Sequence, residues 1–407
     1  MTLELAPQPT LLDSMVSAGR ENLRVFELDF RSDPRWGQFI STHPQASIYH
    51  HPGWLQALED EYRQKCVSLA CEDEQGSLRA VLPLFYTKGS PISLGRAATG
   101  RRLSSLPRTP IAGPLAVNQE ALVAIVKYAT ELADSRGVQL EIKTHIADMG
   151  KSLPSLAYLH WRPTFVAELP SRTEGSAWEE FWENLRVPRA CTSCDGCKRL
   201  RFGNAKRQHR VNWAVNKATK LGLQVREAQT EEDLKQWYEL YLLTMRNNAV
   251  PPRPYRLFRS LWNSLRPTGK MRLLVAERTK KRRKRIIAGS VLLQFGQTVA
   301  YAFTGCAPQD FGLHPHDILQ IEAIRSACRS GFRWYDFGEV AEEHEALTQF
   351  KTKWGGDPMP LYRYYYPAAP AGLPSGDSGV TAAARKLWRF LPPKATAILG
   401  DFIYSRM

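Results

Sequence analysis

The sequence predicts a mixed α/β protein built from two tandem domains of similar architecture. Segments with the apolar spacing of helices alternate along the chain with short apolar runs typical of strands. The two halves share an order: helices, a strand–turn–strand unit, an amphipathic helix, a glycine and a strand. We therefore expect two copies of one unit, each with a mixed, mostly antiparallel sheet flanked by helices. The alternative is a chance similarity between two α/β patterns.

Length and composition bound the class of protein. The 407 residues are enough for two or three domains, and 43% of them are hydrophobic, so real cores can be filled. No apolar run approaches the ~20 residues that span a bilayer, and the first residues lack a basic start and a long apolar segment. The seven cysteines are odd in number and irregularly spaced, which argues against a disulfide framework. We therefore expect a cytoplasmic protein.

The first half is expected to span residues 23–175, after a flexible leader at 1–22. Its helices place apolar side chains on one face, as Trp54 and Leu58 do, and Gly137 ends the last of them. The predicted elements are, in order, a strand at 24–28, helices at 33–43 and 52–62, a hairpin that turns at Gly76, an irregular loop at 103–115, a helix at 120–135 and a strand at 138–145.

The second half is expected to span residues 176–367 and to contain a cysteine-rich insertion at 188–200. It repeats the pattern of the first half, with a basic helix at its start that Gly222 closes. The predicted elements are, in order, a helix at 205–221, a strand at 222–228, helices at 231–247 and 255–265, three strands within 272–306, a helix at 317–330 and strands at 333–338 and 360–367.

A linker and a helical tail are expected to follow. Residues 368–380 are rich in Pro, Gly, Ala and Ser and have almost no apolar periodicity, which is typical of a linker. Residues 381–407 predict two short amphipathic helices broken at Pro392 and Pro393. These helices either pack on the body of the protein or make peripheral contact with a membrane, which Arg385 and Lys394 favour.

The chain is strongly basic, with 55 Lys and Arg against 40 Asp and Glu and a formal net charge of +15. This excess favours an anionic partner such as nucleic acid, a nucleotide cofactor, a phosphorylated lipid or an acidic membrane, and simple solubility is the alternative. The clusters lack the interleaved aromatics of a base-reading module. They comprise Lys198, Arg199, Arg201, Lys206, Arg207, Arg210, Lys217 and Lys220 near the basic helix, and a run at 279–285 that is expected to be a hairpin turn.

The segment from Gln309 to Pro315 is a candidate phosphate-binding loop. It lies between a strand pair and a helix, where several backbone N–H groups point the same way and the helix dipole attracts an anion. The pattern is Gln309-x-x-Gly312-x-His314, and His314 stands where a small residue is usual in GNAT acetyltransferases. Asp317 and Gln320 also fit an N-terminal capping box, so a plain loop before a capped helix is the alternative.

A series of motifs near the end of the second half carries a family resemblance. A strand ends at Tyr335-Asp336-Phe337-Gly338, Phe-Lys-x-x-x-Gly-Gly follows at 350–356, and an aromatic strand comes next. Over about residues 34–366 the chain resembles the FemAB-like branch of the GNAT fold, including bacterial acyltransferases that accompany exopolysaccharide and exosortase systems. The resemblance implies a twin GNAT-like fold and transfer of an acyl or aminoacyl group to an amine.

The resemblance also implies site residues. Phe350 and Lys351 are expected at the reaction centre, where a fixed cation lowers the energy of a developing oxyanion. Asp336 is expected to accept the proton of the amine, and a turn-capping role is its alternative. Donor binding is expected at Gln309, Gly312 and His314. Substrate binding is expected at Tyr49, Trp54, Trp354, Gly355 and Gly356.

The spacing Cys191-x-x-Cys194-x-x-Cys197 resembles a metal-binding pattern. It supplies only three thiolates and no second Cys-x-x-Cys, although His209 follows twelve residues later. We therefore expect no metal, and the alternative keeps these three cysteines as ligands.

These observations together predict an N-acyltransferase. The expected donor is acyl-CoA, most simply acetyl-CoA, and the expected acceptor is an amine on a small molecule or a lipid- or sugar-linked precursor of the cell envelope or an exopolysaccharide. One alternative uses aminoacyl-tRNA to extend a peptidoglycan precursor. Another is a non-catalytic protein that binds anions for an envelope export system. The basic surface and the tail could also place the protein at the periphery of the inner membrane.

Overall fold

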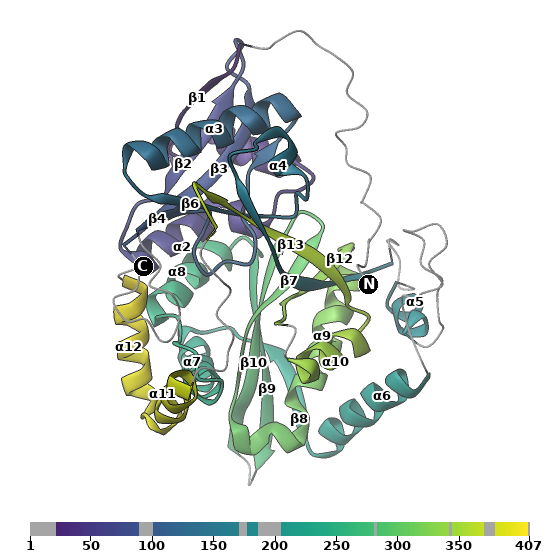
Figure 1. Ribbon diagram of the computed structural model, residues 1–407. Helices are drawn as coiled ribbons and strands as arrows, with labels where there is room; N and C mark the ends of the chain where they lie inside the picture. The colour runs from purple at the N-terminus through teal and green to yellow at the C-terminus, as the bar shows by residue number, and fades with distance from the viewer. Residues whose placement is uncertain are drawn as a thin grey trace.

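The structure is a computed structural model, and it describes residues 22–88, 101–170, 177–185, 205–280, 283–341, 344–369 and 379–405. Nearly all of the predicted leader, the cysteine-rich insertion at 188–200 and most of the predicted linker lie outside these residues. Figure 1 shows one large twisted sheet that runs through the molecule, with helices on both of its faces.

The helices and strands of the first half begin where the sequence offers a cap. Asp33 accepts a hydrogen bond from the backbone of Arg35 at the start of α1, and Asn118 does the same for Ala121 at the start of α3. The elements are β1 (Arg24–Glu27), α1 (Pro34–Thr42), the 3-10 helix η1 (Ile48–His50), α2 (Pro52–Tyr62), β2 (Val67–Glu72), β3 (Leu78–Thr87), β4 (Arg102–Ser104), β5 (Leu115–Ala116), α3 (Gln119–Ser135), β6 (Gln139–Thr144), α4 (Met149–Ser152) and β7 (Ala157–Glu168).

The second half repeats this series. Thr230 and Asp233 form a capping box at the start of α7. The elements are α5 (Ala177–Asn184), α6 (Ala205–Lys220), β8 (Leu223–Glu227), α7 (Glu231–Asn247), α8 (Tyr255–Leu265), β9 (Met271–Lys280), β10 (Arg283–Phe295), β11 (Thr298–Cys306), the 3-10 helix η2 (Pro308–Leu313), α9 (Pro315–Arg329), β12 (Trp334–Glu339), α10 (Glu345–Lys353), β13 (Asp357–Tyr366), and the tail helices α11 (Gly379–Phe390) and α12 (Pro393–Ser405).

The two halves contribute to a single sheet. The strand order is β1-β2-β3-β4-β6-β13-β7-β12-β11-β10-β9-β8, and β5 pairs with β3 beside this path. The mixed α/β class and the tandem repetition are therefore confirmed, but the two expected sheets are joined edge to edge. The loop predicted at 103–115 is partly wrong, because β4 and β5 occupy its two ends.

The junction between the halves is made by an exchange of their last strands. β7, from the first half, pairs with β12 of the second, while β13 pairs with β6 of the first. β7 and β13 then pair with each other in an antiparallel manner. The boundary predicted between residues 175 and 176 stays a prediction, since hydrogen bonding of the sheet crosses it in both directions.

This exchange brings the carboxyl ends of two strands together. Thr144 at the end of β6 pairs with Tyr362 of β13, and Glu339 at the end of β12 pairs with Thr164 of β7. Thr164 in turn pairs with Met359 of β13. The ends of β6 and β12 therefore point toward each other across the middle of the β7–β13 pair.

The apolar core also joins the halves. One cluster combines buried side chains of α1 and α2, such as Trp54 and Tyr62, with side chains of α7 and α8, such as Trp237 and Phe258. Two further clusters lie one in each half, under α9 and under α3. Burial of several large aromatic side chains at the junction makes the arrangement of the two halves a packed interface.

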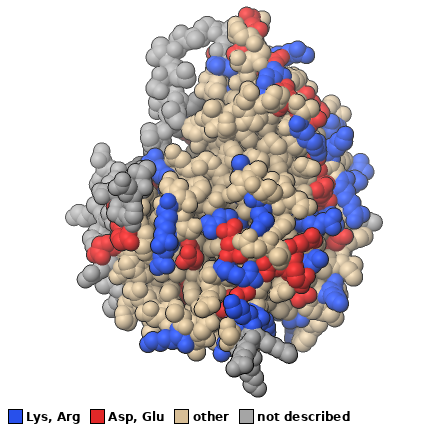
Figure 2. Space-filling model, turned by 180° about the vertical axis from the view of Figure 1, so that it is seen from behind, with Lys and Arg blue, Asp and Glu red and all other residues tan. Residues whose placement is uncertain are grey.

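The charged groups are distributed over the surface without a single dominant patch on the face shown in Figure 2, where basic and acidic side chains lie intermingled. In the described part of the chain, no helix is long and apolar enough to cross a membrane.

The tail helix α12 packs closely against the body. Its buried side contains Thr396, Gly400, Ile403 and Tyr404. A Cβ at Gly400 would overlap the carbonyl oxygen of Pro252 in the segment between α7 and α8. The absence of a side chain at this position therefore permits the contact.

We predict that Gly400→Ala lowers the free energy of unfolding by about 1–3 kcal/mol, because the clash outweighs the better helix propensity of alanine. Gly37→Ala is the matched control, since Gly37 also lies inside a helix but has open space around its Cβ position. The control variant should be neutral or more stable by up to about 1 kcal/mol. Urea unfolding of both variants measures the difference, and equal effects would contradict the packing argument.

Candidate active site

The carboxylate of Asp336 lies where β12 departs from regular pairing. The register between β12 and β7 shifts after Asp336, and Gly338 adopts a positive φ of 80°. Asp336 Oδ1 accepts hydrogen bonds from Thr164 Oγ1 at 2.6 Å and from the Gly338 backbone N–H at 2.8 Å. Oδ2 accepts no hydrogen bond from any described residue. The carboxylate is thus held in place by one oxygen and keeps the other available.

Lys351 is buried beside this bulge. Its ammonium donates to the carbonyl oxygens of Gly338 at 2.8 Å and Glu339 at 3.3 Å, and only 7% of the residue is exposed. Burial lowers the pKa of Lys351 to about 8, although the carboxylates of Asp336 and Glu339 act in the opposite direction. Lys351 is therefore not a solvated surface lysine, and one of its three N–H donors remains for another acceptor.

Tyr49 reaches the same place from the first half. Burial raises the pKa of Tyr49, and the nearby carboxylates of Asp336 and Glu339 raise it further. Its ring packs edge-on against Trp54 at 5.1 Å, and its hydroxyl donates to no described residue. The structure therefore brings Tyr49 close to Asp336, although 287 residues separate them in the sequence. Lys351 joins them from a different element, α10.

Trp54 itself is a packing residue. It is 1% exposed and stacks on Phe303 at 6.5 Å. The guanidinium of Arg253 lies 5.7 Å from the Trp54 ring centre and forms a buried, two-bonded ion pair with Glu61 at 2.9 Å. Trp54 thus supports Tyr49 from behind and does not offer a free ring face to a substrate.

Several residues of this cluster were missed by sequence reasoning. His145 follows β6, bonds the carbonyl oxygen of Pro360 at 3.2 Å, and lies close enough to Asp336 for its pKa to be affected. Glu339 accepts a hydrogen bond from Trp161 Nε1 at 2.7 Å. These residues come from four strands that meet only because of the strand exchange, so no local sequence pattern marks them.

The candidate phosphate loop has a compact form. Gln309 and Gly312 lie in η2, and His314 adopts a left-handed conformation, with φ 58°, immediately before Pro315 begins α9. His314 lies within 3.5 Å of both the Lys217 ammonium and the Asp317 carboxylate. The start of α9 is therefore surrounded by side chains of both signs, and the helix dipole favours the carboxylate of Asp317 among them.

The loop and the Lys351 region are connected through α10. Lys353, two residues after Lys351, donates to Asp317 Oδ1 in the first turn of α9 at 2.5 Å. Lys217 of α6 lies 4.8 Å from the ring centre of Trp213, which is 53% exposed and packs edge-on against His314. An anion at the start of α9 would therefore meet two ammonium groups close to the reaction-centre candidates.

The two strands that flank this region diverge. β11 and β12 are parallel and pair only from Thr298–Ala300 to Trp334–Asp336. Beyond this point β11 stays with β10 as far as Cys306, while β12 continues toward β7. Their facing backbone groups are thus not paired with each other, and Asp336 lies at the point of divergence. An extended ligand can pair with such groups.

The Phe-Lys-x-x-x-Gly-Gly motif forms the turn from α10 to β13. Gly355 has a φ of 84°, and a Cβ at Gly356 would press on Phe337 and on the Lys351 carbonyl oxygen. Phe350 is partly buried against the core and its ring lies 4.7 Å from the Lys353 ammonium. Trp354 is fully buried. These residues have structural reasons to be present, and substrate contact by them stays a prediction.

The position in the first half that matches Asp336 holds a carboxylate already paired with cations. β4 and β6 form the matching parallel pair, and their register places Glu141 where Asp336 stands in the second half. Burial alone would raise the pKa of Glu141, but Lys143, Arg102 and Arg363 together hold it at about 2. Arg102 and Arg363 lie 3.3 and 3.0 Å from its oxygens. The first half therefore holds a neutralised carboxylate, and the second half holds an available one.

The possible metal ligands Cys191, Cys194 and Cys197 lie outside the described residues. Among the residues that the structure describes, no group of three or more His, Cys, Asp or Glu is arranged to hold a metal ion.

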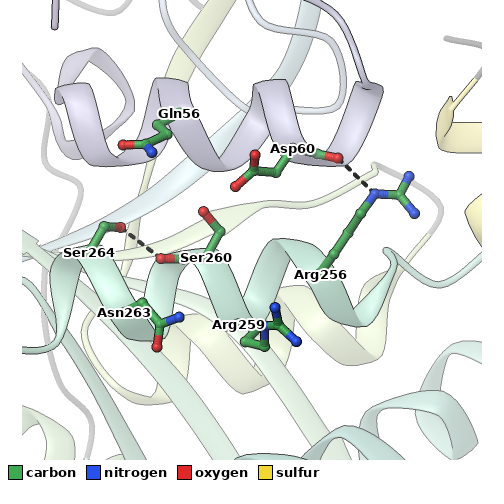
Figure 3. Close-up of a pocket in the computed structure, with 7 residues that line it drawn as sticks. All are labelled: Gln56, Asp60, Arg256, Arg259, Ser260, Asn263 and Ser264. Carbon is green, nitrogen blue, oxygen red and sulfur yellow. Dashed lines mark hydrogen bonds between the residues drawn. The ribbon is translucent and has the colours of Figure 1, made fainter.

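A cavity of about 570 Å³ opens elsewhere on the junction, between α2 and α8 (Figure 3). Asp60 and Arg256 face each other across it, and the Arg256 side chain donates to the Asp60 carbonyl oxygen at 2.7 Å. The lining is polar and consists of Gln56, Asp60, Arg256, Arg259, Ser260, Asn263 and Ser264. None of the predicted site residues lines it, so the strand-end cluster remains the candidate site.

Comparison with known proteins agrees with this geometry. Residues 205–351 match the acetyltransferase (GNAT) domain family. The chain has a FemAB-like GNAT fold. The match covers α6 to Lys351 and so includes the loop at Gly312, the divergence of β11 from β12, and Asp336. No curated protein matches the chain by sequence.

Solved structures show the same fold over the whole chain. The structure of FemX is 14% identical, with a TM-score of 0.58 over 84% of this chain and 97% of FemX. L-PGS from Bacillus licheniformis is 11% identical, with a TM-score of 0.51 over 89% and 97% of the two chains. A conserved protein of unknown function from Bacteroides thetaiotaomicron VPI-5482 is 9% identical, with a TM-score of 0.52 over 85% and 99%. The likeness extends beyond one GNAT domain to the tandem arrangement.

We predict a specific pH dependence for Lys351→Met. Because the pKa of Lys351 is lowered from 10.5 to about 8 in the folded protein, protonation costs folding stability below pH 8, and this cost disappears as the pH rises toward 10.5. Wild type should therefore gain about 3 kcal/mol relative to Lys351→Met between these two pH values. Lys353→Met is the control, and its difference from wild type should not follow this pH course. Chemical unfolding between pH 7.5 and 10 measures both, and a flat difference for Lys351→Met would contradict the burial argument.

Proposed function

We propose that this protein is an N-acyltransferase that uses acyl-CoA to acylate an amine on a cell-envelope or exopolysaccharide precursor. The observation that carries the proposal is the position of an available carboxylate, Asp336, at the point where β11 and β12 diverge. The loop from Gln309 to His314 follows directly after β11. Lys353 of α10, two residues after Lys351, donates a hydrogen bond to Asp317 in the helix that the loop precedes. A GNAT fold alone is compatible with several chemistries, so the site residues are what support this one.

The residues divide the chemistry between them. An amine must lose a proton when its nitrogen attacks a thioester carbonyl, and Asp336 Oδ2 is placed to accept that proton. The carbonyl oxygen becomes negative before the carbon–sulfur bond breaks, and the remaining N–H donor of Lys351 can stabilise this charge. The sulfur leaves as the thiolate of CoA. Tyr49 lies near enough to Asp336 for the two groups to interact electrostatically, and its hydroxyl is a further polar group for the acceptor.

The start of α9 suits the anionic part of the donor. The helix dipole and the ammonium of Lys217 favour a diphosphate there, and Lys353 offsets the charge of Asp317 in the same turn. Acetyl-CoA is the simplest donor that fits, and no metal is required in this scheme.

One observation favours aminoacyl-tRNA as the alternative donor. Helix α6 carries the exposed Trp213 beside Lys217, and exposed Arg210 and Lys220 lie on the same helix. The expectation that the basic clusters lack interleaved aromatics is therefore wrong for α6, because Trp213 lies between Arg210 and Lys217. An exposed aromatic ring between cations can stack on an unpaired base, and the cations can hold its phosphate backbone. In this case the acceptor would be a peptidoglycan precursor.

We predict that acetyl-CoA stabilises the protein by about 2.7 kcal/mol at a concentration one hundred times its Kd. Thermal unfolding with increasing acetyl-CoA measures this, and Lys217→Glu should weaken the response because it reverses the charge beside the loop. Lys127→Glu, on α3, is the charge-matched control. If acetyl-CoA gives no shift while charged tRNA binds in a filter assay, the CoA assignment fails and the alternative donor is supported.

We predict that Asp336→Asn lowers kcat by about 100-fold or more while the stabilisation by acetyl-CoA is retained, because the amide cannot take the proton of the amine. Asp148→Asn, an exposed aspartate on the first half, is the control and should keep full activity. The assay follows release of free CoA thiol with simple amino sugars as acceptors. Unchanged turnover in Asp336→Asn would exclude Asp336 as the base, and acetyl-CoA binding without turnover by wild type on any amine would support the non-catalytic alternative.

A further inference from the structure

The two tail helices expose large apolar side chains beside basic ones. Leu387, Phe390 and Ile398 are 67%, 76% and 71% exposed, and Leu399 is partly exposed as well. We call these four residues the tail face. Buried residues of α12 on its other side fix that helix to the body, so the exposure of Ile398 and Leu399 is a consequence of how α12 packs.

The packing of α12 leaves no freedom to turn this face inward. Gly400 contacts the Pro252 backbone, and Tyr404 lies with its ring centre 5.7 Å from the Arg253 guanidinium. Asp401 forms ion pairs with Arg256 and Arg63. Helix α11 is tied to the body by a hydrogen bond from Arg389 Nε to the Asn247 carbonyl oxygen at 3.0 Å.

Within the tail helices, the charged side chains before Asp401 have one sign. From residue 379 to residue 400 the chain contains Arg385, Lys386, Arg389 and Lys394 and no Asp or Glu. Arg385, Lys386 and Lys394 are exposed. This differs from the intermingled charges on the face shown in Figure 2. Helices that combine exposed Leu, Phe and Ile with Lys and Arg bind at the interface of anionic bilayers.

We propose that the tail face docks on the surface of a bilayer that contains anionic phospholipids. The apolar side chains of α11 and α12 enter the boundary between headgroups and acyl chains, and Arg385, Lys386 and Lys394 contact the lipid phosphates. The body stays on the water side, because the buried side of α12 is held by α7 and by the segment at Pro252. Docking in this manner uses no residue of the candidate active site.

The test is co-sedimentation of the full chain with phosphatidylcholine vesicles, with and without phosphatidylglycerol. We expect binding to vesicles that contain phosphatidylglycerol, at least about tenfold weaker binding to phosphatidylcholine alone, and release by high salt. Arg385→Glu with Lys386→Glu should lower the partition coefficient about tenfold or more. Phe390→Ser with Ile398→Ser should lower it as well, since these residues provide the apolar contact.

The matched control is Lys127→Glu with Lys151→Glu. It makes the same change in net charge at α3 and α4, which lie at the opposite end of the molecule from α11 and α12 (Figure 1). This variant should bind as wild type does. Circular dichroism and thermal unfolding of each variant verify that the fold is kept.

Three results would overturn the proposal. The first is no vesicle binding by wild type, and the second is equal vesicle binding by wild type and both tail variants. The third is a dimer in sedimentation equilibrium that Phe390→Ser dissociates, because a second copy of the chain would then cover the tail face. None of these results bears on acyl transfer, which acetyl-CoA binding and turnover measure separately.

Discussion

The antiparallel pairing of β7 with β13 is the constraint on which the site depends. Each of these strands ends one half of the chain and is built into the sheet of the other. Without their pairing the structure would hold two sheets, and the carboxyl ends of β6 and β12 would have no reason to meet. With it, Tyr49 and His145 from the first half lie beside Asp336 and Lys351 from the second. The candidate site is therefore a property of the tandem arrangement, although the residues matched to a GNAT domain belong to one half.

The two halves repeat a fold but not an electrostatic environment. Glu141 and Asp336 occupy matching places beside parallel strand pairs. Two arginines and a lysine neutralise Glu141 and stabilise its ionised form although it is buried. With a pKa of about 2, Glu141 is a poor proton acceptor. Asp336 accepts only neutral hydrogen bonds, from Thr164 and from a backbone N–H. The first half thus uses this position to hold strands together, whereas in the second half one carboxylate oxygen accepts no hydrogen bond from the described residues, as the proposed function requires.

The sequence predicted where helices and strands begin and end more completely than which elements pack or pair with each other. Helix periodicity, caps and glycines placed α2, α3, α7 and α8 almost to the residue, because these signals are local. The motif series also identified Asp336 and Lys351, and the structure places them together. It did not reveal that Lys351 is buried, nor that Glu339 and His145 join it, because burial and strand partners arise from pairings more than 100 residues apart. For Gly355 and Gly356, the sequence motif predicted substrate contact but did not reveal a structural role. Gly355 adopts a positive φ, and Gly356 lies too close to Phe337 and to the Lys351 carbonyl oxygen for a side chain.

The buried ion pair of Arg253 and Glu61 connects the remaining parts of the structure. Breaking such a pair by removing one partner costs about 3–5 kcal/mol, whereas forming it gains little, so its contribution is to select one arrangement over others. Here the arrangement joins α2 of the first half to the segment before α8 of the second. The same guanidinium contacts the rings of Trp54, which supports Tyr49, and of Tyr404 in α12. One buried charge therefore contacts both the ring that supports Tyr49 and the helix that carries Ile398 and Leu399, so a bilayer under the tail would hold the candidate site at a fixed height above its surface.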